Sequence, residues 1–208
     1  MLSIRQFSKS YYQRTVLQIE ELVFAPGAHW IQGENGSGKS TLFKAIGSLI
    51  PFQGFISFQQ FDNRKHRVPF QRALGFAEAE PLYPAMLTGL DLISFTRQIK
   101  KASTASTFEL VESLGMFDYL HQPISTFSSG MLKKLSLAIA FVGEPDLLVL
   151  DEPYITLDAD ARGVLNNILS TYLQQGATLL FSSHQAIEGI EIAAISHYKI
   201  HQQRLIRT

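Results

Sequence analysis

The sequence predicts an α/β fold in which a largely parallel β-sheet carries helices, with an α-helical subdomain inserted. Residues 146–151 (DLLVLD) and 177–183 (ATLLFSS) are short apolar runs, typical of strands buried on both faces of a parallel sheet. Helical periodicity at 159–175 separates them, so strands and helices alternate. From 86 to 143 the pattern is helical and β-branched runs thin out, which indicates an insertion.

The N-terminal part is expected to hold antiparallel strands that precede this core. Strands are predicted at 3–7, 16–19, 28–31, 54–58 and 73–77, with a turn at 25–27 (APG). A helix is expected from Leu42 to about Leu49, before Pro51. The chain of 208 residues is therefore predicted to be a single domain, with its core at 1–85 and 144–208 and the helical subdomain at about 86–143.

Composition excludes several classes of function. Lys and Arg together number 18, as do Asp and Glu, so a basic footprint for nucleic acid is absent and no nucleic-acid partner is expected. The absence of cysteine excludes disulfides, thiolate zinc sites and cysteine nucleophiles. No apolar run approaches 18 residues, and the N-terminus lacks a signal-peptide layout. We therefore expect a soluble, cytoplasmic protein that reaches a membrane only through a partner.

Residues 33–41 (GENGSGKST), termed the phosphate loop below, match the pattern G-x-x-x-x-G-K-[ST]. Glycines let successive backbone N–H groups converge on an anion, and the helix that follows adds the positive end of its dipole. Lys39 can reach the β- and γ-phosphates, and the Ser40 hydroxyl can bind Mg²⁺. The motif predicts a P-loop NTPase (RecA-like) core with a mixed or parallel sheet. The predicted phosphate-binding residues are Gly33, Asn35, Gly36, Ser37, Gly38, Lys39, Ser40 and Thr41.

Two carboxylates follow the apolar strand at 146–151. Asp151 and Glu152 should lie at the carboxyl edge of a parallel sheet, where such folds bind ligands. In phosphate-loop NTPases an acid at this place holds Mg²⁺. We therefore predict that Asp151 binds the metal and that Glu152 polarises the attacking water.

Further motifs resemble those of ABC-type ATPases. Residues 147–153 (LLVLDEP), followed by Leu157 and Asp158, look like the Walker B and D-loop region of that family. Upstream, 127–131 (FSSGM) resembles the family's signature, usually LSGGQ. His184 follows a buried strand, as the family's switch histidine does. Tyr11 precedes a strand, as does the aromatic that stacks on adenine; Tyr12 takes that role if the register slips by one residue.

The resemblance implies a composite site for ATP and Mg²⁺. In the family, two ATPase domains dimerise head to tail around two ATP molecules, so a homodimer, or a heterodimer with a similar ATPase subunit, is expected. Ser128 and the Gly130 N–H of one subunit would then reach the γ-phosphate held by the other. Lys39, Glu152 and His184 are the expected catalytic residues.

The sequence departs from the family pattern at two places. The family has a glutamine after the strand at 73–77, where it touches Mg²⁺ and the attacking water, and this chain has none there. Counting forward places Ala79 at that position, counting back places Glu78 there, and Glu80 is near. A carboxylate can ligate Mg²⁺, so we predict Glu78 as a metal ligand. In the signature, Ser129 and Met131 replace Gly and Gln.

The resemblance implies the ATP-binding and ATP-hydrolysing subunit of an ABC transporter, of the bacterial exporter type. It would power an integral-membrane permease on a separate chain, from the cytoplasmic face of the membrane. Residues 81–95 would line a groove for the permease. Two alternatives remain: a non-transport ABC ATPase, and an ATP-binding regulatory module with weak hydrolysis. Zero net charge disfavours the first for polyanion partners, and Glu152 with His184 disfavours the second.

Overall fold

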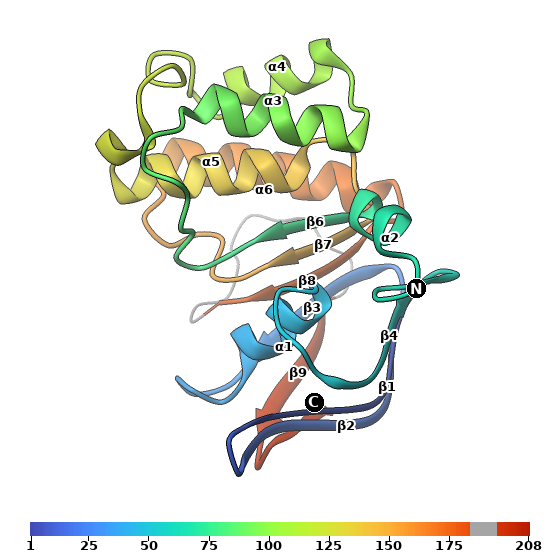
Figure 1. Cartoon of the computed structure of the whole chain (residues 1–208). Helices are drawn as coiled ribbons and strands as arrows, with labels where there is room; N and C mark the ends of the chain where they lie inside the picture. The colour runs from blue at the N-terminus through green and yellow to red at the C-terminus, as the bar shows by residue number, and fades with distance from the viewer. Residues whose placement is uncertain (184–194) are drawn as a thin grey trace.

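The computed structural model describes residues 1–183 and 195–208, and its described strands form a single sheet (Figure 1). The order across the sheet is β5-β4-β1-β2-β10-β9-β3-β8-β7-β6. The strands are β1 (Leu2–Tyr11), β2 (Arg14–Phe24), β3 (Gly27–Gln32), β4 (Gln53–Phe58), β5 (Phe61–Asp62), β6 (Leu74–Ala77), β7 (Leu147–Leu150), β8 (Thr178–Ser182), β9 (Ile195–His201) and β10 (Arg204–Arg207). The helices are α1 (Lys39–Ile46), α2 (Arg67–Ala73), α3 (Gly89–Lys100), α4 (Thr104–Ser113), η1 (Ile124–Thr126), α5 (Ser129–Phe141) and α6 (Ala159–Gln174).

One half of the sheet is parallel, as the two apolar runs predict. Strand β8 pairs in parallel with β3 and β7, and β7 pairs in parallel with β6. Every residue of β7 and β8 is buried, because helices or other strands cover both faces. The carboxyl ends of β3, β6, β7 and β8 therefore meet at one edge of the sheet, and this edge carries the predicted site.

The other half of the sheet is antiparallel, which confirms the expectation for the N-terminal strands. Strand β1 pairs antiparallel with β2 and with β4. The hairpin β9–β10 joins the two halves, since β9 pairs in parallel with β3 and β10 with β2. This hairpin was not predicted from the sequence, because β9 has a mixed, half-exposed burial pattern.

The stretch between β6 and β7 is helical. Helices α3, α4 and α5 occupy it, and Figure 1 shows α3 and α4 lying beyond α5 on the side away from the sheet. These helices enclose a hydrophobic cluster separate from those of the sheet; its members include Ile93, Val111, Leu114, Met116, Leu120, Leu135 and Ala138. The predicted subdomain limits of about 86–143 enclose all three helices; the division into core and subdomain remains a prediction.

Two short elements in the N-terminal half were not predicted. Helix α2 begins at Arg67 and buries Phe70 against the sheet. Strand β5 is a two-residue extension that pairs with β4. Within 1–183 and 195–208, no helix is long and apolar enough to cross a membrane.

Candidate functional site

The phosphate loop connects β3 to α1 and has the backbone that an anion nest requires. Gly36 and Gly38 adopt positive φ angles of 77° and 112°, which favour glycine. Gly38 is the N-cap of α1, so the amino end of this helix faces the loop. The Lys39 side chain reaches back to the start of the loop. Its Nζ donates to the carbonyl oxygens of Gly33 at 2.7 Å and Glu34 at 3.1 Å.

A pocket of about 280 Å³ unites the phosphate loop with the two acids. Its lining residues are Asn35, Gly36, Ser37, Gly38, Lys39, Ser40, Thr41, Ala79, Asp151 and Glu152. The acids reach it because β7 ends beside β6, where the Asp151 N–H donates to the Ala77 carbonyl at 2.8 Å. Residues more than one hundred positions apart in the sequence therefore share one cavity.

A serine that the sequence analysis did not single out orients both acids. Ser182 is fully buried at the end of β8, and its hydroxyl donates to Asp151 Oδ1 at 2.6 Å. The Ser182 hydroxyl oxygen also accepts a hydrogen bond from the Glu152 N–H at 3.0 Å. Glu152 has a positive φ of 46°, an uncommon conformation for glutamate, which this hydrogen bond helps to hold. A polar residue at the end of a mostly apolar strand was the available signal.

The residue types around the pocket fit a phosphate chain with a divalent cation. The phosphate loop with Lys39 lines the pocket together with two acidic residues, Asp151 and Glu152. The Ser37 hydroxyl is buried without a hydrogen-bond partner among the described residues, as expected for a donor reserved for a ligand. ATP phosphates would be held by the loop, and Mg²⁺ by Ser40 and Asp151.

The missing glutamine leaves an alanine at the pocket wall. Ala79 lines the pocket, whereas Glu78 does not. The Glu78 carboxylate instead forms an ion pair with Lys44 of α1, at 3.2 Å. Of the three candidates for the glutamine position, Ala79 is therefore the one that faces the phosphate loop.

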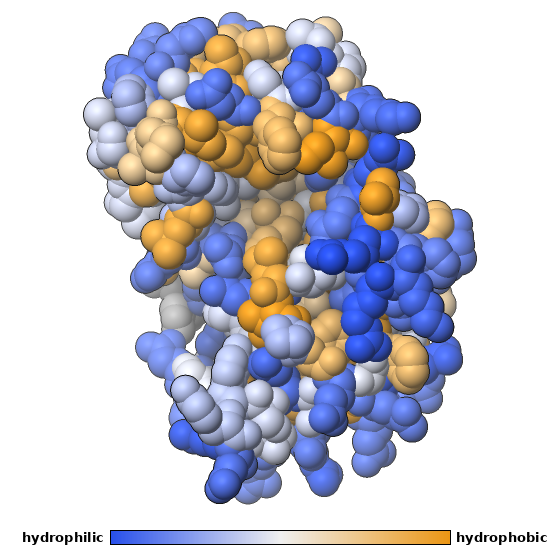
Figure 2. All heavy atoms as spheres, viewed as in Figure 1, coloured by the Kyte–Doolittle hydropathy of each residue, from blue (hydrophilic) through white to orange (hydrophobic). Residues whose placement is uncertain are grey.

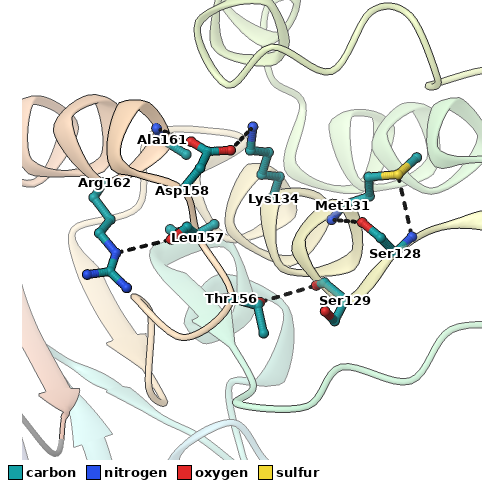
Figure 3. A network of polar contacts seen from close by, with 9 residues as sticks. All are labelled: Ser128, Ser129, Met131, Lys134, Thr156, Leu157, Asp158, Ala161 and Arg162. Carbon is teal, nitrogen blue, oxygen red and sulfur yellow. Dashed lines mark hydrogen bonds and ion pairs between the residues drawn. The ribbon is translucent and has the colours of Figure 1, made fainter.

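The segment 127–131 that resembles the family signature packs against residues 156–158 (Figure 3). Thr156 Oγ1 donates to the Ser129 carbonyl at 3.4 Å, and a Cβ added at Gly130 would lie 3.0 Å from the Thr156 carbonyl oxygen. Asp158 caps α6 through the Ala161 N–H at 2.7 Å and forms an ion pair with Lys134 of α5 at 3.3 Å. A side chain at position 130 would therefore push the Thr156 carbonyl away by a few tenths of an ångström.

Met131 has a structural role in the signature segment. Ser128 is the N-cap of α5, where its hydroxyl accepts the Met131 N–H at 3.2 Å (Figure 3). The Ser128 N–H in turn donates to the Met131 thioether sulfur at 3.4 Å. This is a capping box with sulfur in the place of a glutamine or glutamate oxygen. The departure from Gln therefore preserves the geometry of the helix start, and the Ser128 side chain stays exposed.

Three predicted site residues remain: Tyr11, Tyr12 and His184. Tyr11 ends β1 and is 44% exposed, with Lys9 Nζ 4.6 Å from its ring centroid. Tyr12 lies in the turn that follows and is fully exposed. His184 lies outside the described residues. Neither tyrosine lines the phosphate pocket, so adenine stacking at Tyr11 or Tyr12 stays a prediction.

The fold and the pocket define a P-loop nucleotide-binding protein, and the comparisons give its family. The sequence model of the ABC transporter family matches residues 21–155, so the chain belongs to that family. It is 31% identical over 182 residues to the ABC transporter ATP-binding protein NatA of Bacillus subtilis, covering 85% of this chain and 74% of that protein. It is 30% identical over 186 residues to the lantibiotic transport ATP-binding protein SrtF of Streptococcus pyogenes, covering 88% of this chain and 80% of that protein.

Solved structures agree with the fold. The structure of an ATP-binding subunit of an ABC transporter superposes with a TM-score of 0.87 at 25% identity, over 98% of this chain and 87% of that one. The dimeric structure of MJ0796, a bacterial ABC transporter cassette, gives a TM-score of 0.83 at 18% identity, over 99% of this chain and 96% of that one. This chain therefore has the fold of an ABC ATPase cassette along nearly its whole length.

Proposed function

We propose that this protein hydrolyses ATP to drive a separate membrane permease. The observation that carries the proposal is the shared pocket, in which the phosphate loop faces Asp151 and Glu152. A phosphate chain and a carboxylate that can orient water come together there, as ATP hydrolysis requires. Membership of the ABC transporter family supports the same activity.

Each residue has a role that its position allows. The loop N–H groups and Lys39 bind the β- and γ-phosphates, and in doing so Lys39 exchanges its bonds to Gly33 and Glu34 for phosphate oxygens. Ser40 and Asp151 hold Mg²⁺, which neutralises charge on the phosphates when bound. Glu152, held by Ser182, orients the attacking water and accepts its proton. His184 is proposed as a further contact to the γ-phosphate.

The site is proposed to be completed by a second ATPase subunit. Ser128 is exposed at the amino end of α5, so its hydroxyl is accessible to a ligand held by another molecule. The amino end of a helix favours an anion. The dimeric cassette structures among the neighbours support a dimer around two ATP molecules, formed by two copies or by this chain and a similar subunit.

The permease is proposed to dock on the segment that follows β6. Leu82 and Met86 are 91% and 85% exposed, unusual values for large apolar side chains. Apolar residues gather between the helical stretch and the sheet on the face drawn in Figure 2. Leu82 follows Ala79 by three residues, so a contact at Leu82 can influence the phosphate pocket. Export is the favoured direction, since the relatives include the cytochrome c biogenesis export protein CcmA of Idiomarina loihiensis.

Glu152→Gln tests the hydrolytic proposal. A positioned base contributes about 10²–10⁴ in rate, so phosphate release should fall by that factor while binding of a fluorescent ATP analogue persists. Light scattering should show an ATP-dependent dimer that accumulates in the variant. Glu109→Gln, an exposed acid on α4, is the control and should behave like the wild type. If Glu152→Gln hydrolyses ATP at the wild-type rate, the assignment of the base is wrong.

The double variant Leu82→Ser, Met86→Ser tests the docking surface. Both side chains are exposed, so nucleotide binding and thermal stability should hardly change. Co-purification of the tagged chain with an integral-membrane protein should be lost. The non-transport alternative predicts that the wild type captures no membrane protein. The regulatory alternative predicts that the wild type releases no phosphate even with its permease bound.

A further inference from the structure

Lys133 on α5 is a buried lysine, only 1% exposed. Its ammonium donates three hydrogen bonds to backbone carbonyl oxygens: Glu78 at 2.8 Å, Ala79 at 3.1 Å and Asp151 at 3.1 Å. An ammonium has three donors and no acceptor, so every donor is used. Burying such a group without these partners would be strongly unfavourable, which makes the arrangement specific.

The three acceptors belong to two segments that form one wall of the phosphate pocket. Ala79 lines that pocket after β6, and Asp151 lines it after β7. Pairing of β6 with β7 and the Asp151 N–H bond to Ala77 already join these strand ends. Lys133 adds a side-chain link from a helix that also carries Ser128 at its amino end.

The charge of Lys133 also faces the acids of the site. Burial lowers its pKa to about 8, and the carboxylates of Asp151 and Glu152 oppose that shift. Its neighbour on the β6 side, Glu78, directs its carboxylate to Lys44. A buried cation beside two carboxylates offsets their mutual repulsion when no metal is bound.

We propose that Lys133 is a positioning residue for ATP hydrolysis, which fixes the backbone at Ala79 and Asp151 so that the metal-binding carboxylate and the pocket wall keep their spacing. This inference rests on the proposed function. It assigns catalytic importance to a helix-buried lysine that contacts no part of the substrate.

Lys100 provides a matched comparison at the opposite end of β6. Its Nζ donates to the Leu74 carbonyl at 2.7 Å, and burial lowers its pKa to about 8 as well. Leu74 begins β6, so this lysine ties a helix to the end of the strand that is remote from the pocket. If Lys133 only stabilised the fold, replacing it would affect stability and activity in the same way as replacing Lys100.

The experiment compares Lys133→Met with Lys100→Met in the full chain. Steady-state ATPase assays give kcat, KM for ATP and the Mg²⁺ concentration for half-maximal activity, and thermal unfolding gives Tm. We expect Lys133→Met to lower kcat at least tenfold and to raise the Mg²⁺ requirement. Lys100→Met should leave kcat and the Mg²⁺ requirement at wild-type values. A Lys133→Met variant with wild-type kcat and Mg²⁺ requirement would overturn the proposal.

Chemical rescue separates positioning from a loss of folding. The chain has no cysteine, so Lys133→Cys can be alkylated selectively with 2-bromoethylamine in denaturant and refolded, which restores an ammonium at nearly the same distance. We expect the alkylated protein to regain kcat and the low Mg²⁺ requirement. If it regains Tm without regaining kcat, the proposal fails.

Failure of the proposed function can be distinguished from failure of this inference. A wild type that releases no phosphate, alone or with its permease, would count against ATP hydrolysis. Binding of a fluorescent ATP analogue as a function of Mg²⁺ then tests Lys133 directly. A shift of that Mg²⁺ dependence in Lys133→Met and not in Lys100→Met supports the positioning role, and equal curves contradict it.

Discussion

The hydroxyl of Ser182 donates to Oδ1 of Asp151 at 2.6 Å and accepts the Glu152 N–H at 3.0 Å. One buried oxygen at the end of β8 therefore fixes both acids that follow β7. Ser182→Ala would leave the Glu152 N–H without this acceptor, at a cost of about 1–3 kcal/mol in the free energy of unfolding. We expect a lower Tm, a higher Mg²⁺ requirement and at least a severalfold loss of kcat.

The conservative variant distinguishes the hydroxyl from the packing. Ser182→Thr keeps the oxygen and suits a strand, so it should retain most of the activity that Ser182→Ala loses. Circular dichroism melts and phosphate-release assays on both variants check this. Equal kcat in the alanine variant and the wild type would show that the serine has no role in orienting the acids.

Gly38 is the glycine whose replacement should affect nucleotide binding most directly. Its φ of 112° strains any residue with a side chain, and a Cβ there would lie 3.1 Å from Val16 Cγ1. Gly38→Ala should therefore distort the start of α1 and weaken binding of an ATP analogue by at least tenfold. Isothermal titration calorimetry measures this.

Gly163 is the matched control for Gly38. It lies within α6, at ordinary helical φ, and a Cβ added there meets nothing within 4 Å. Gly163→Ala should raise the free energy of unfolding by about 0.4–1 kcal/mol and leave ATP affinity unchanged. A loss of affinity in Gly163→Ala as large as in Gly38→Ala would mean that the loop conformation is not the cause.

The parallel core was predictable because its strands carry a strong local signal. Residues 147–150 and 178–182 are fully buried, so their sequence is apolar almost throughout, and the glycine pattern of the phosphate loop is dictated by backbone geometry. The hairpin β9–β10 was missed because a half-exposed strand imposes less on its sequence. The strands at the edges of the sheet begin and end where their pairing with neighbouring strands begins and ends, which composition does not reveal.

The parts of the site that escaped prediction depend on contacts between distant residues. Lys133 reads as an ordinary surface lysine in a helical segment, and only the packing of α5 over the ends of β6 and β7 reveals its three acceptors. Ser182 is equally inconspicuous until β8 lies beside β7. Residue types and their spacing can be read from the local sequence. The hydrogen bonds that hold the pocket-lining residues in place can be recognised only in the folded structure.

Burial of Lys100 should make the free energy of unfolding depend on pH. Its folded pKa of about 8 lies below the ordinary 10.5, because burial disfavours the charged form. Between these two values the unfolded chain binds more protons than the folded one, so stability rises with pH. We expect Lys100→Met to lose a rise of roughly 1–3 kcal/mol between about pH 8 and pH 9.5, measured by urea unfolding. Identical pH profiles of the wild type and the variant would contradict this assignment.

Substitutions at Ala79 and at Glu78 test which of the two residues occupies the position where the family has glutamine. Ala79 lines the phosphate pocket, and Glu78 is held by Lys44 at 3.2 Å. Ala79→Gln would add an amide oxygen at the pocket wall, so we expect half-maximal ATPase activity at a severalfold lower Mg²⁺ concentration. Glu78→Gln removes a partly exposed ion pair, which contributes little to stability, and should leave the Mg²⁺ requirement unchanged.

Both variants are compared with the wild type in Mg²⁺ titrations of ATPase activity and of ATP-analogue binding. The two readouts separate a change in metal affinity from a change in the chemical step. If Glu78→Gln raises the Mg²⁺ requirement and Ala79→Gln has no effect, Glu78 is the metal ligand. Because Glu78 does not line the phosphate pocket, its side chain would then have to turn away from Lys44 to reach the metal.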